Sequence, residues 1–306
     1  MTIKIITADE RIARRSKINI ALFGPSGIGK TSLARSLDPN KTLVIDLESG
    51  TLALQDWGGD VLDVRESAAA IGADPWEFAR GLICLLSGPD PADQGGPYSR
   101  AMYDAYCKSI LDPKAFDKYD TIFIDSITVA SRHAFAWARR QPEAFSEKSG
   151  KPDTRGAYGL LGREMVTWLT MAQHTPGKSI VVVGILDRRE DDLGRLEWRP
   201  QIEGGKTGRE LAGIFDQVIT MQYLTDDTGA PLLNDKGRKV RALFTAQDNV
   251  PGYPAKDRSG RLEPIEPPHL GKLMAKVAAA NAGKKKPAAA EPLQTTIPAT
   301  TREAES

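Results

Sequence analysis

Residues 24–31 read GPSGIGKT, and this stretch decides how the rest of the chain is interpreted. It follows residues 18–23, INIALF, an apolar run with the length and composition of a buried strand. It precedes residues 32–37, SLARSL, in which leucine recurs at a helical interval. The glycines therefore lie at a predicted turn from a strand into a helix.

A turn of this kind is typical of a phosphate-binding loop. Glycine can adopt the positive φ angles with which a backbone curls around an anion, and a following helix favours negative charge at its first amides. Lys30 is then expected to reach the β- and γ-phosphates, and the Thr31 hydroxyl to bind Mg²⁺. A glycine-rich loop that only turns the chain is the alternative, but the flanking strand and helix favour the phosphate site. The predicted nucleotide-binding residues are Gly24, Pro25, Ser26, Gly27, Ile28, Gly29, Lys30, Thr31 and Ser32.

Composition limits the remaining function classes. The 306 residues suffice for one large α/β core or two small domains. With 41 basic and 40 acidic residues, the chain has no overall preference for nucleic acid or membrane, so any polyanion site must be local. The two cysteines cannot build a disulfide framework, which favours a reducing, cytoplasmic location. We expect no membrane partner, because the longest apolar stretch, residues 180–186, is too short to span a bilayer.

Strands and helices are predicted to alternate along the chain. Strand signals fall at residues 18–23, 42–46, 121–125, 179–186 and 217–222. Most are separated by stretches long enough for a helix, so we predict an α/β fold with a mainly parallel, doubly wound sheet and flanking helices.

Three further regions complete the predicted organisation. Residues 57–118 exceed what one crossover needs and are expected to add helices around a loop at residues 87–98. Residues 232–246, with a turn signal at 234–237, predict a C-terminal β-hairpin, and residues 269–280 predict a helix. From residue 281 onward the chain is rich in Ala, Pro and Thr. We therefore predict one domain over residues 1–280 and a disordered, low-complexity tail over 281–306.

Carboxylates follow two of the predicted strands. Asp46 and Glu48 end the strand at 42–46, and Asp125 ends the strand at 121–125. Parallel strands present their carboxyl ends at one edge of a sheet, so these acids should lie near the phosphate loop. Asp125 fits the Walker B carboxylate that orders Mg²⁺, and Glu48 is our choice for the carboxylate that activates water. Asp46 is the alternative for the second role, while a helix cap at Asp125 and an exposed loop acid at Glu48 are the structural alternatives.

These motifs resemble those of RecA-like ATPases, and more closely those of small bacteriophage RecA-like ATPases implicated in single-strand annealing and recombination. The shared segments are LFGPSGIGKTSLA, LVIDLESG, IDSIT, FDQVITM and AKDRSGRL, and the resemblance spans residues 17–276. It implies a RecA-like P-loop ATPase that uses ATP and Mg²⁺, with Lys30 and Glu48 as catalytic residues. It further implies a homo-oligomer stimulated by single-stranded DNA, in a bacterial host cell if phage-encoded. The sequence departs from the family at Asp187, where a polar sensor of the γ-phosphate is expected.

The resemblance also suggests where DNA and neighbouring subunits would bind. The candidate DNA-binding residues are Arg139, Arg140, Lys151, Arg155, Lys206 and Arg209, in two loop regions with mixed charge. Lys256 and Arg258 are candidate cations that would act on a neighbour's ATP site. A solvated charged surface remains the alternative for both sets. A small-molecule kinase and a nucleotide-gated DNA-binding scaffold with weak hydrolysis remain the alternatives for the whole protein.

Overall fold

The structure is a computed structural model that describes residue 7, residues 17–190 and residues 194–279. The side chains of residues 205, 206 and 209 lie outside this description. The predicted tail at 281–306 is also outside the described residues.

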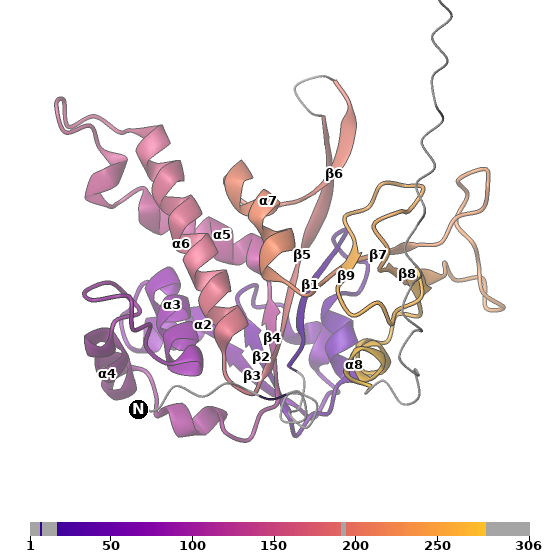
Figure 1. Cartoon of the computed structure of the whole chain (residues 1–306), viewed down its shortest axis with the longest axis horizontal. Helices are drawn as coiled ribbons and strands as arrows, with labels where there is room; N and C mark the ends of the chain where they lie inside the picture. The colour runs from indigo at the N-terminus through magenta and orange to yellow at the C-terminus, as the bar shows by residue number, and fades with distance from the viewer. Residues whose placement is uncertain (1–6, 8–16, 191–193, 280–306) are drawn as a thin grey trace, which may run out of the picture.

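A ten-stranded mixed sheet forms the centre of the molecule (Figure 1). Its main path runs β10-β8-β7-β1-β5-β4-β2-β3, with β6 paired to β5 and β9 paired to β7. The strands are β1 (Asn19–Gly24), β2 (Thr42–Asp46), β3 (Asp60–Asp63), β4 (Thr121–Asp125), β5 (Ser179–Glu190), β6 (Leu196–Pro200), β7 (Gln217–Tyr223), β8 (Arg241–Phe244), β9 (Lys256–Asp257) and β10 (Ile265–Glu266).

The six strands from β7 to β3 on this path run parallel to one another. All five predicted strands are present, and β1, β2 and β4 are buried along their whole length. Buried parallel strands carry continuous apolar runs, which is why these strands could be predicted. The α/β class with a mainly parallel sheet and flanking helices is therefore confirmed.

Helices cover both faces of the sheet. They are α2 (Val64–Ala70), α3 (Pro75–Ser87), α4 (Arg100–Ser109), α5 (Ile127–Ala138), α6 (Thr154–His174), α7 (Gly205–Ile214) and α8 (Leu270–Ala278), with 3₁₀ turns η1 (Thr31–Ser36), η2 (Thr51–Leu54), η3 (Pro113–Phe116) and η4 (Pro142–Ala144). The helix predicted after the glycine loop is the short 3₁₀ helix η1, and the predicted C-terminal helix is α8. The extra helices predicted within residues 57–118 are α2, α3 and α4, and strand β3, which had no clear signal, lies there too.

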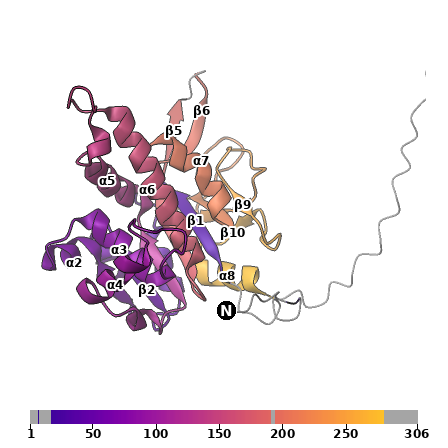
Figure 2. The same ribbon diagram turned by 60° about the vertical axis from the view of Figure 1, so that its left-hand side comes forward.

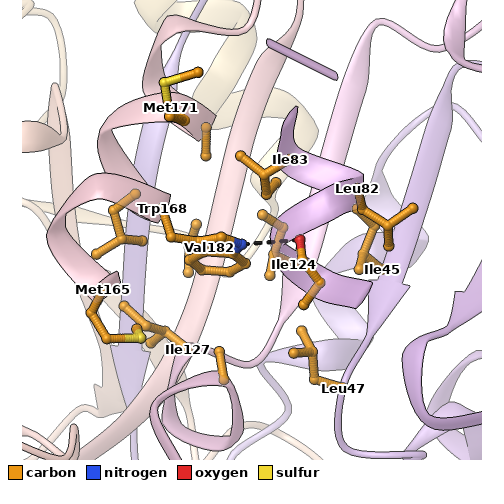
Figure 3. Packing of buried hydrophobic residues seen from close by; sticks show 14 of the residues in the cluster. Ile45, Leu47, Leu82, Ile83, Ile124, Ile127, Met165, Trp168, Met171 and Val182 are labelled. Atoms are coloured by element: carbon orange, nitrogen blue, oxygen red, sulfur yellow. Dashed lines mark hydrogen bonds between the residues drawn. The ribbon is translucent and has the colours of Figure 1, made fainter. Parts of the chain in front are cut away.

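Alternating side chains of each buried strand feed two hydrophobic clusters. Ala21 and Phe23 of β1 belong to the cluster under α3, α5 and α6, whereas Ile20 and Leu22 belong to the cluster under η1 and α8. Figure 3 shows Trp168 of α6 between the sheet and α3, with its indole Nε1 donating a hydrogen bond of 3.1 Å to the Ala79 carbonyl. This packing fixes β1 and β4 between two layers, so the loops at their carboxyl ends leave from a rigid support.

Two segments project from the body on the side of these carboxyl ends (Figures 1 and 2). One is the connection between α5 and α6, and the other is the antiparallel β5–β6 hairpin. β5 pairs with β1 up to Ile185, opposite Gly24, and then continues beyond the sheet edge to Glu190.

The predicted C-terminal hairpin is present. Its turn at 234–237 is closed by the Gly237 N–H, which donates to the Asn234 carbonyl at 2.8 Å. Leu233 and Lys239 form an antiparallel bridge between the two arms, and the Val240 N–H donates to the Leu232 carbonyl at 2.8 Å. The second arm continues into β8, which pairs antiparallel with β7.

Candidate nucleotide-binding site

The glycine loop leaves the carboxyl end of β1 in a conformation that requires glycine. Gly27 and Gly29 have φ angles of +75° and +101°. A Cβ atom placed on Gly24 would lie 2.6 Å from the Met221 carbonyl oxygen of β7. The spacing of the glycines therefore follows from backbone geometry and from the neighbouring strand.

Lys30 folds back over its own loop. Its Nζ donates hydrogen bonds to the carbonyl oxygens of Gly24 and Pro25, at 2.9 and 3.0 Å. Burial lowers the pKa of Lys30, while the nearby charges of Asp125 and Glu48 oppose that change. A buried ammonium held only by carbonyl oxygens can exchange these contacts for phosphate oxygens.

Thr31 and Asp125 meet although they are far apart in the sequence. The Thr31 hydroxyl donates a hydrogen bond to the Asp125 carboxylate, which lies at the end of β4 and is buried. Burial raises the pKa of Asp125 to about 6, and the Thr31 hydroxyl opposes this increase. Hydroxyl and carboxylate oxygens are ligands that Mg²⁺ prefers, so this pair fits the predicted metal site.

Asp46 and Glu48 lie in different environments. Asp46 is buried, and its two carboxylate oxygens accept the backbone N–H groups of Glu48 and Gly50 at 2.8 and 2.9 Å. Burial raises the pKa of Asp46, and these N–H donors oppose the rise. Glu48 is exposed, and its carboxylate accepts a hydrogen bond from the Ser126 hydroxyl. Asp46 thus organises the turn that carries Glu48, whereas Glu48 faces the residue next to Asp125.

Ser126 is a site residue that the sequence analysis did not select. It follows Asp125 through a cis peptide bond, and its side chain caps α5 by accepting the Val129 N–H at 3.4 Å. The sequence feature that could have indicated Ser126 is its position directly after Asp125, at the end of a predicted strand. Through Ser126, the carboxylates of β2 and β4 are connected at the same edge of the sheet.

The candidate DNA-binding residues have different surroundings. Lys151 is exposed on the connection between α5 and α6, and Arg155 is exposed in the first turn of α6. Arg139 lies over the Phe135 ring at 5.9 Å, and Arg140 pairs with Asp74, the N-cap of α3. Lys206 and Arg209 lie within α7, and their side chains fall outside the described part of the structure.

Lys256 and Arg258 contact the carboxyl end of α7. The Lys256 ammonium donates to the carbonyls of Ala212 and Phe215, the latter at 2.9 Å. The Arg258 guanidinium donates to the Asp216 carboxylate at 2.7 Å. Any action on a neighbouring subunit would require these contacts to be exchanged.

Asp187 lies beyond the point where β5 leaves the main sheet. Its carboxylate is 3.6 Å from the Arg189 guanidinium. An arginine neighbour of this kind partly offsets the negative charge of Asp187.

The chain was compared with curated proteins and with solved structures. A search of curated proteins gives no match. Among solved structures, the RadB recombinase is 13% identical, with 82% of this chain and 90% of that chain covered and a TM-score of 0.30. The flagellar accessory protein FlaH from Methanocaldococcus jannaschii is also 13% identical, with 81% and 87% covered and a TM-score of 0.31.

Two observations bear on the class of protein. Among the described residues, no helix combines the length and apolar character needed to cross a membrane. The model of the family described as AAA domain matches residues 16–259, which includes the glycine loop, both carboxylate strands and the β7–β8 region. The chain therefore belongs to the AAA domain family of P-loop proteins.

Proposed function

We propose that this chain binds ATP with Mg²⁺ on residues 24–32 and hydrolyses it to ADP and phosphate. The observation that carries this proposal is the set of contacts at the sheet edge. Thr31 contacts Asp125, and Ser126, the next residue, contacts Glu48. These groups lie beside a loop whose lysine is held only by backbone carbonyls.

Each residue has a defined role in the proposed reaction. Lys30 exchanges its carbonyl contacts for phosphate oxygens, and Thr31 and Asp125 hold Mg²⁺, which offsets phosphate charge when bound. Glu48 accepts the proton of the attacking water as the water oxygen bonds to the γ-phosphorus. The bond from that phosphorus to the bridging oxygen breaks, and ADP leaves with the electron pair. Asp46 is less suited to the role of base because both of its oxygens already accept backbone N–H groups.

We further propose that the ATPase acts on single-stranded DNA in phage-type recombination or annealing, as a homo-oligomer in the cytoplasm. The resemblance of the five shared segments supports this role. Exposed Lys151 and Arg155 on a projecting segment are suited to following a phosphate backbone. Lys256 and Arg258 are the proposed cations for a neighbouring site, and that role requires release of their α7 contacts.

Phosphate release with and without single-stranded DNA tests the proposal. Wild-type protein should release phosphate from ATP with Mg²⁺, and DNA should increase the rate. Lys30→Ala should abolish nucleotide binding or hydrolysis, because it removes the cation built into the loop. Equal turnover by a folded Lys30→Ala protein would contradict the site. ADP formation that needs a small-molecule acceptor, with the phosphoryl group appearing on that acceptor and not as free phosphate, would instead identify a kinase.

A further inference from the structure

Arg241 approaches the phosphate loop from the flank opposite to the carboxylates. Asp125 ends β4 and Glu48 follows β2, and these two strands lie beyond β5 on one side of β1. Arg241 begins β8, on the β7 side of β1, and is the register partner of Tyr223 at the end of β7. The loop is therefore contacted from both sides by different strands.

The guanidinium of Arg241 is bound to the loop backbone. Its Nη1 donates a hydrogen bond of 3.0 Å to the Ile28 carbonyl oxygen. A Cβ atom placed on Gly29 would lie only 2.3 Å from this same Nη1. Glycine is therefore required at position 29 for two reasons. A side chain there would clash with the Arg241 guanidinium, and the φ angle of Gly29 is positive.

This contact determines which way one peptide group of the loop faces. In a trans peptide, the C=O of one residue and the N–H of the next point in opposite directions. Because Arg241 holds the Ile28 carbonyl toward β8, the Gly29 N–H is turned to the other face of the loop. A phosphate cradle works by presenting several such N–H groups to the anion.

We propose that Arg241 is a positioning residue that fixes the Ile28–Gly29 peptide so that the Gly29 N–H binds phosphate. This inference rests on the proposed nucleotide site. It assigns to β8, about 210 residues after the loop, a role that no local motif indicates. Positioning of this kind acts on the bound phosphates in both ground state and transition state, so it should change KM and leave kcat nearly unchanged.

Simple attraction by positive charge is the competing explanation. Arg238, Lys239 and Arg241 line one cavity of about 610 Å³ together with Gly27 and Ile28. Within the described residues, none of these three cations forms an ion pair with a carboxylate. If charge alone mattered, removal of either arginine should weaken nucleotide binding to a similar degree.

The test compares Arg241→Met, Arg241→Lys and Arg238→Met in the full chain. Arg241→Met keeps an unbranched apolar chain and removes both the donor and the charge. Arg241→Lys keeps a donor and the charge, and Arg238→Met removes one charge from the same cavity. Dissociation constants are measured by calorimetry for Mg²⁺-ATP and for inorganic tripolyphosphate, and KM and kcat by phosphate release. Thermal unfolding without nucleotide checks that each variant is folded.

Arg241→Met should weaken the binding of ATP and of tripolyphosphate by the same factor, about tenfold or more, because the Ile28–Gly29 peptide that Arg241 positions contacts only the phosphates. KM should increase to match while kcat stays within about twofold. Arg241→Lys should recover most of the affinity, and Arg238→Met should bind like wild type. Unchanged affinity in Arg241→Met, equal losses in the two Met variants, or a fall confined to kcat would overturn the inference.

The two proposals fail in different ways. If wild-type protein binds ATP and Lys30→Ala does not, the phosphate site stands, and the Arg241 variants then decide the inference alone. If wild-type protein binds neither ATP nor tripolyphosphate, the proposed function itself is wrong.

Discussion

At the scale of single residues, three carboxylates lie at one edge of the sheet, and each has different burial and different hydrogen-bond partners. Asp46 is buried under backbone N–H donors, Asp125 is buried beside Thr31, and Glu48 is exposed next to Ser126. Burial raises the pKa of both Asp46 and Asp125, and for Asp125 the value reaches about 6. The ionised form of Asp125 therefore costs stability until a cation or nucleotide complex offsets its charge.

Replacement of Asp125 by Asn should stabilise the nucleotide-free protein near neutral pH. Because its folded pKa lies above the unfolded value of 3.8, the favourable contribution of wild-type Asp125 is full below that value. It is lost as the pH rises through about 6. Asn does not ionise, so Asp125→Asn should gain up to about 3 kcal/mol in the free energy of unfolding at pH 8 and little at pH 4.

Urea unfolding in EDTA across this pH range measures the difference. Addition of Mg²⁺ and ATP should reverse the order, because only the wild type retains the carboxylate for the metal. A pH-independent difference between the two proteins would show that burial of the charge is not its cause.

At the scale of elements, α3 and α6 are joined by a buried polar contact under the sheet. Arg80 of α3 pairs with Glu164 of α6 at 2.9 Å, and the Trp76 indole donates to the same carboxylate oxygen at 3.0 Å. Burial lowers the pKa of Arg80, whereas Glu164 raises it, and the net direction is upward. The Glu164 carboxylate therefore compensates the desolvation cost of the buried Arg80 charge.

Glu164→Ala should destabilise the protein strongly, because it leaves the Arg80 guanidinium buried without its partner. We expect a loss of about 3–5 kcal/mol in the free energy of unfolding, measured by urea titration. Asp104→Ala, which removes the exposed Arg100–Asp104 pair of α4, is the matched control and should cost less than about 1 kcal/mol. Similar losses in both variants would indicate that burial does not decide the effect.

Some elements could be predicted from the sequence and others could not. The buried strands β1, β2, β4, β5 and β7 were predictable because continuous apolar runs are bounded by turn residues. The edge strand β3 was not, because Asp60 is held by Lys118 and Tyr119, at 2.6 and 2.7 Å, from a distant part of the chain. Likewise the phosphate loop is a local motif, whereas the Arg241 contact to Ile28 exists only after β8 has paired with β7.

At the scale of the whole molecule, the nucleotide site and the two projecting segments lie on the same side of the sheet (Figures 1 and 2). The connection between α5 and α6 is anchored at its base by the stacked rings of Phe135 and Tyr158, with centroids 4.5 Å apart. Lys151 lies on this connection and Arg155 in the first turn of α6, and both are exposed. The arrangement places candidate DNA contacts on an extension of the helices that pack against β5 and β4.

Neutralising Lys151 and Arg155 together should weaken binding of an oligothymidine. Each single-strand phosphate that the protein no longer neutralises should reduce the slope of log affinity against log salt by about 0.7, so two such phosphates predict a change of about 1.4. ATP affinity should be unchanged. Lys108→Ala with Lys114→Ala, exposed residues on α4 and η3, is the charge-matched control. An equal change in slope for the control pair would place the DNA elsewhere.

The central claim is that Glu48 activates water for ATP hydrolysis, and the most direct test measures ATP binding and phosphate release in Glu48→Gln. This substitution keeps the shape of the side chain and removes the base. The account predicts ATP affinity close to that of wild type and a turnover lower by about two orders of magnitude or more. Asp46→Asn is the comparison, because Asp46 also ends β2 but has both oxygens bound to backbone N–H groups. Wild-type turnover in Glu48→Gln, with the loss appearing in Asp46→Asn instead, would contradict the account.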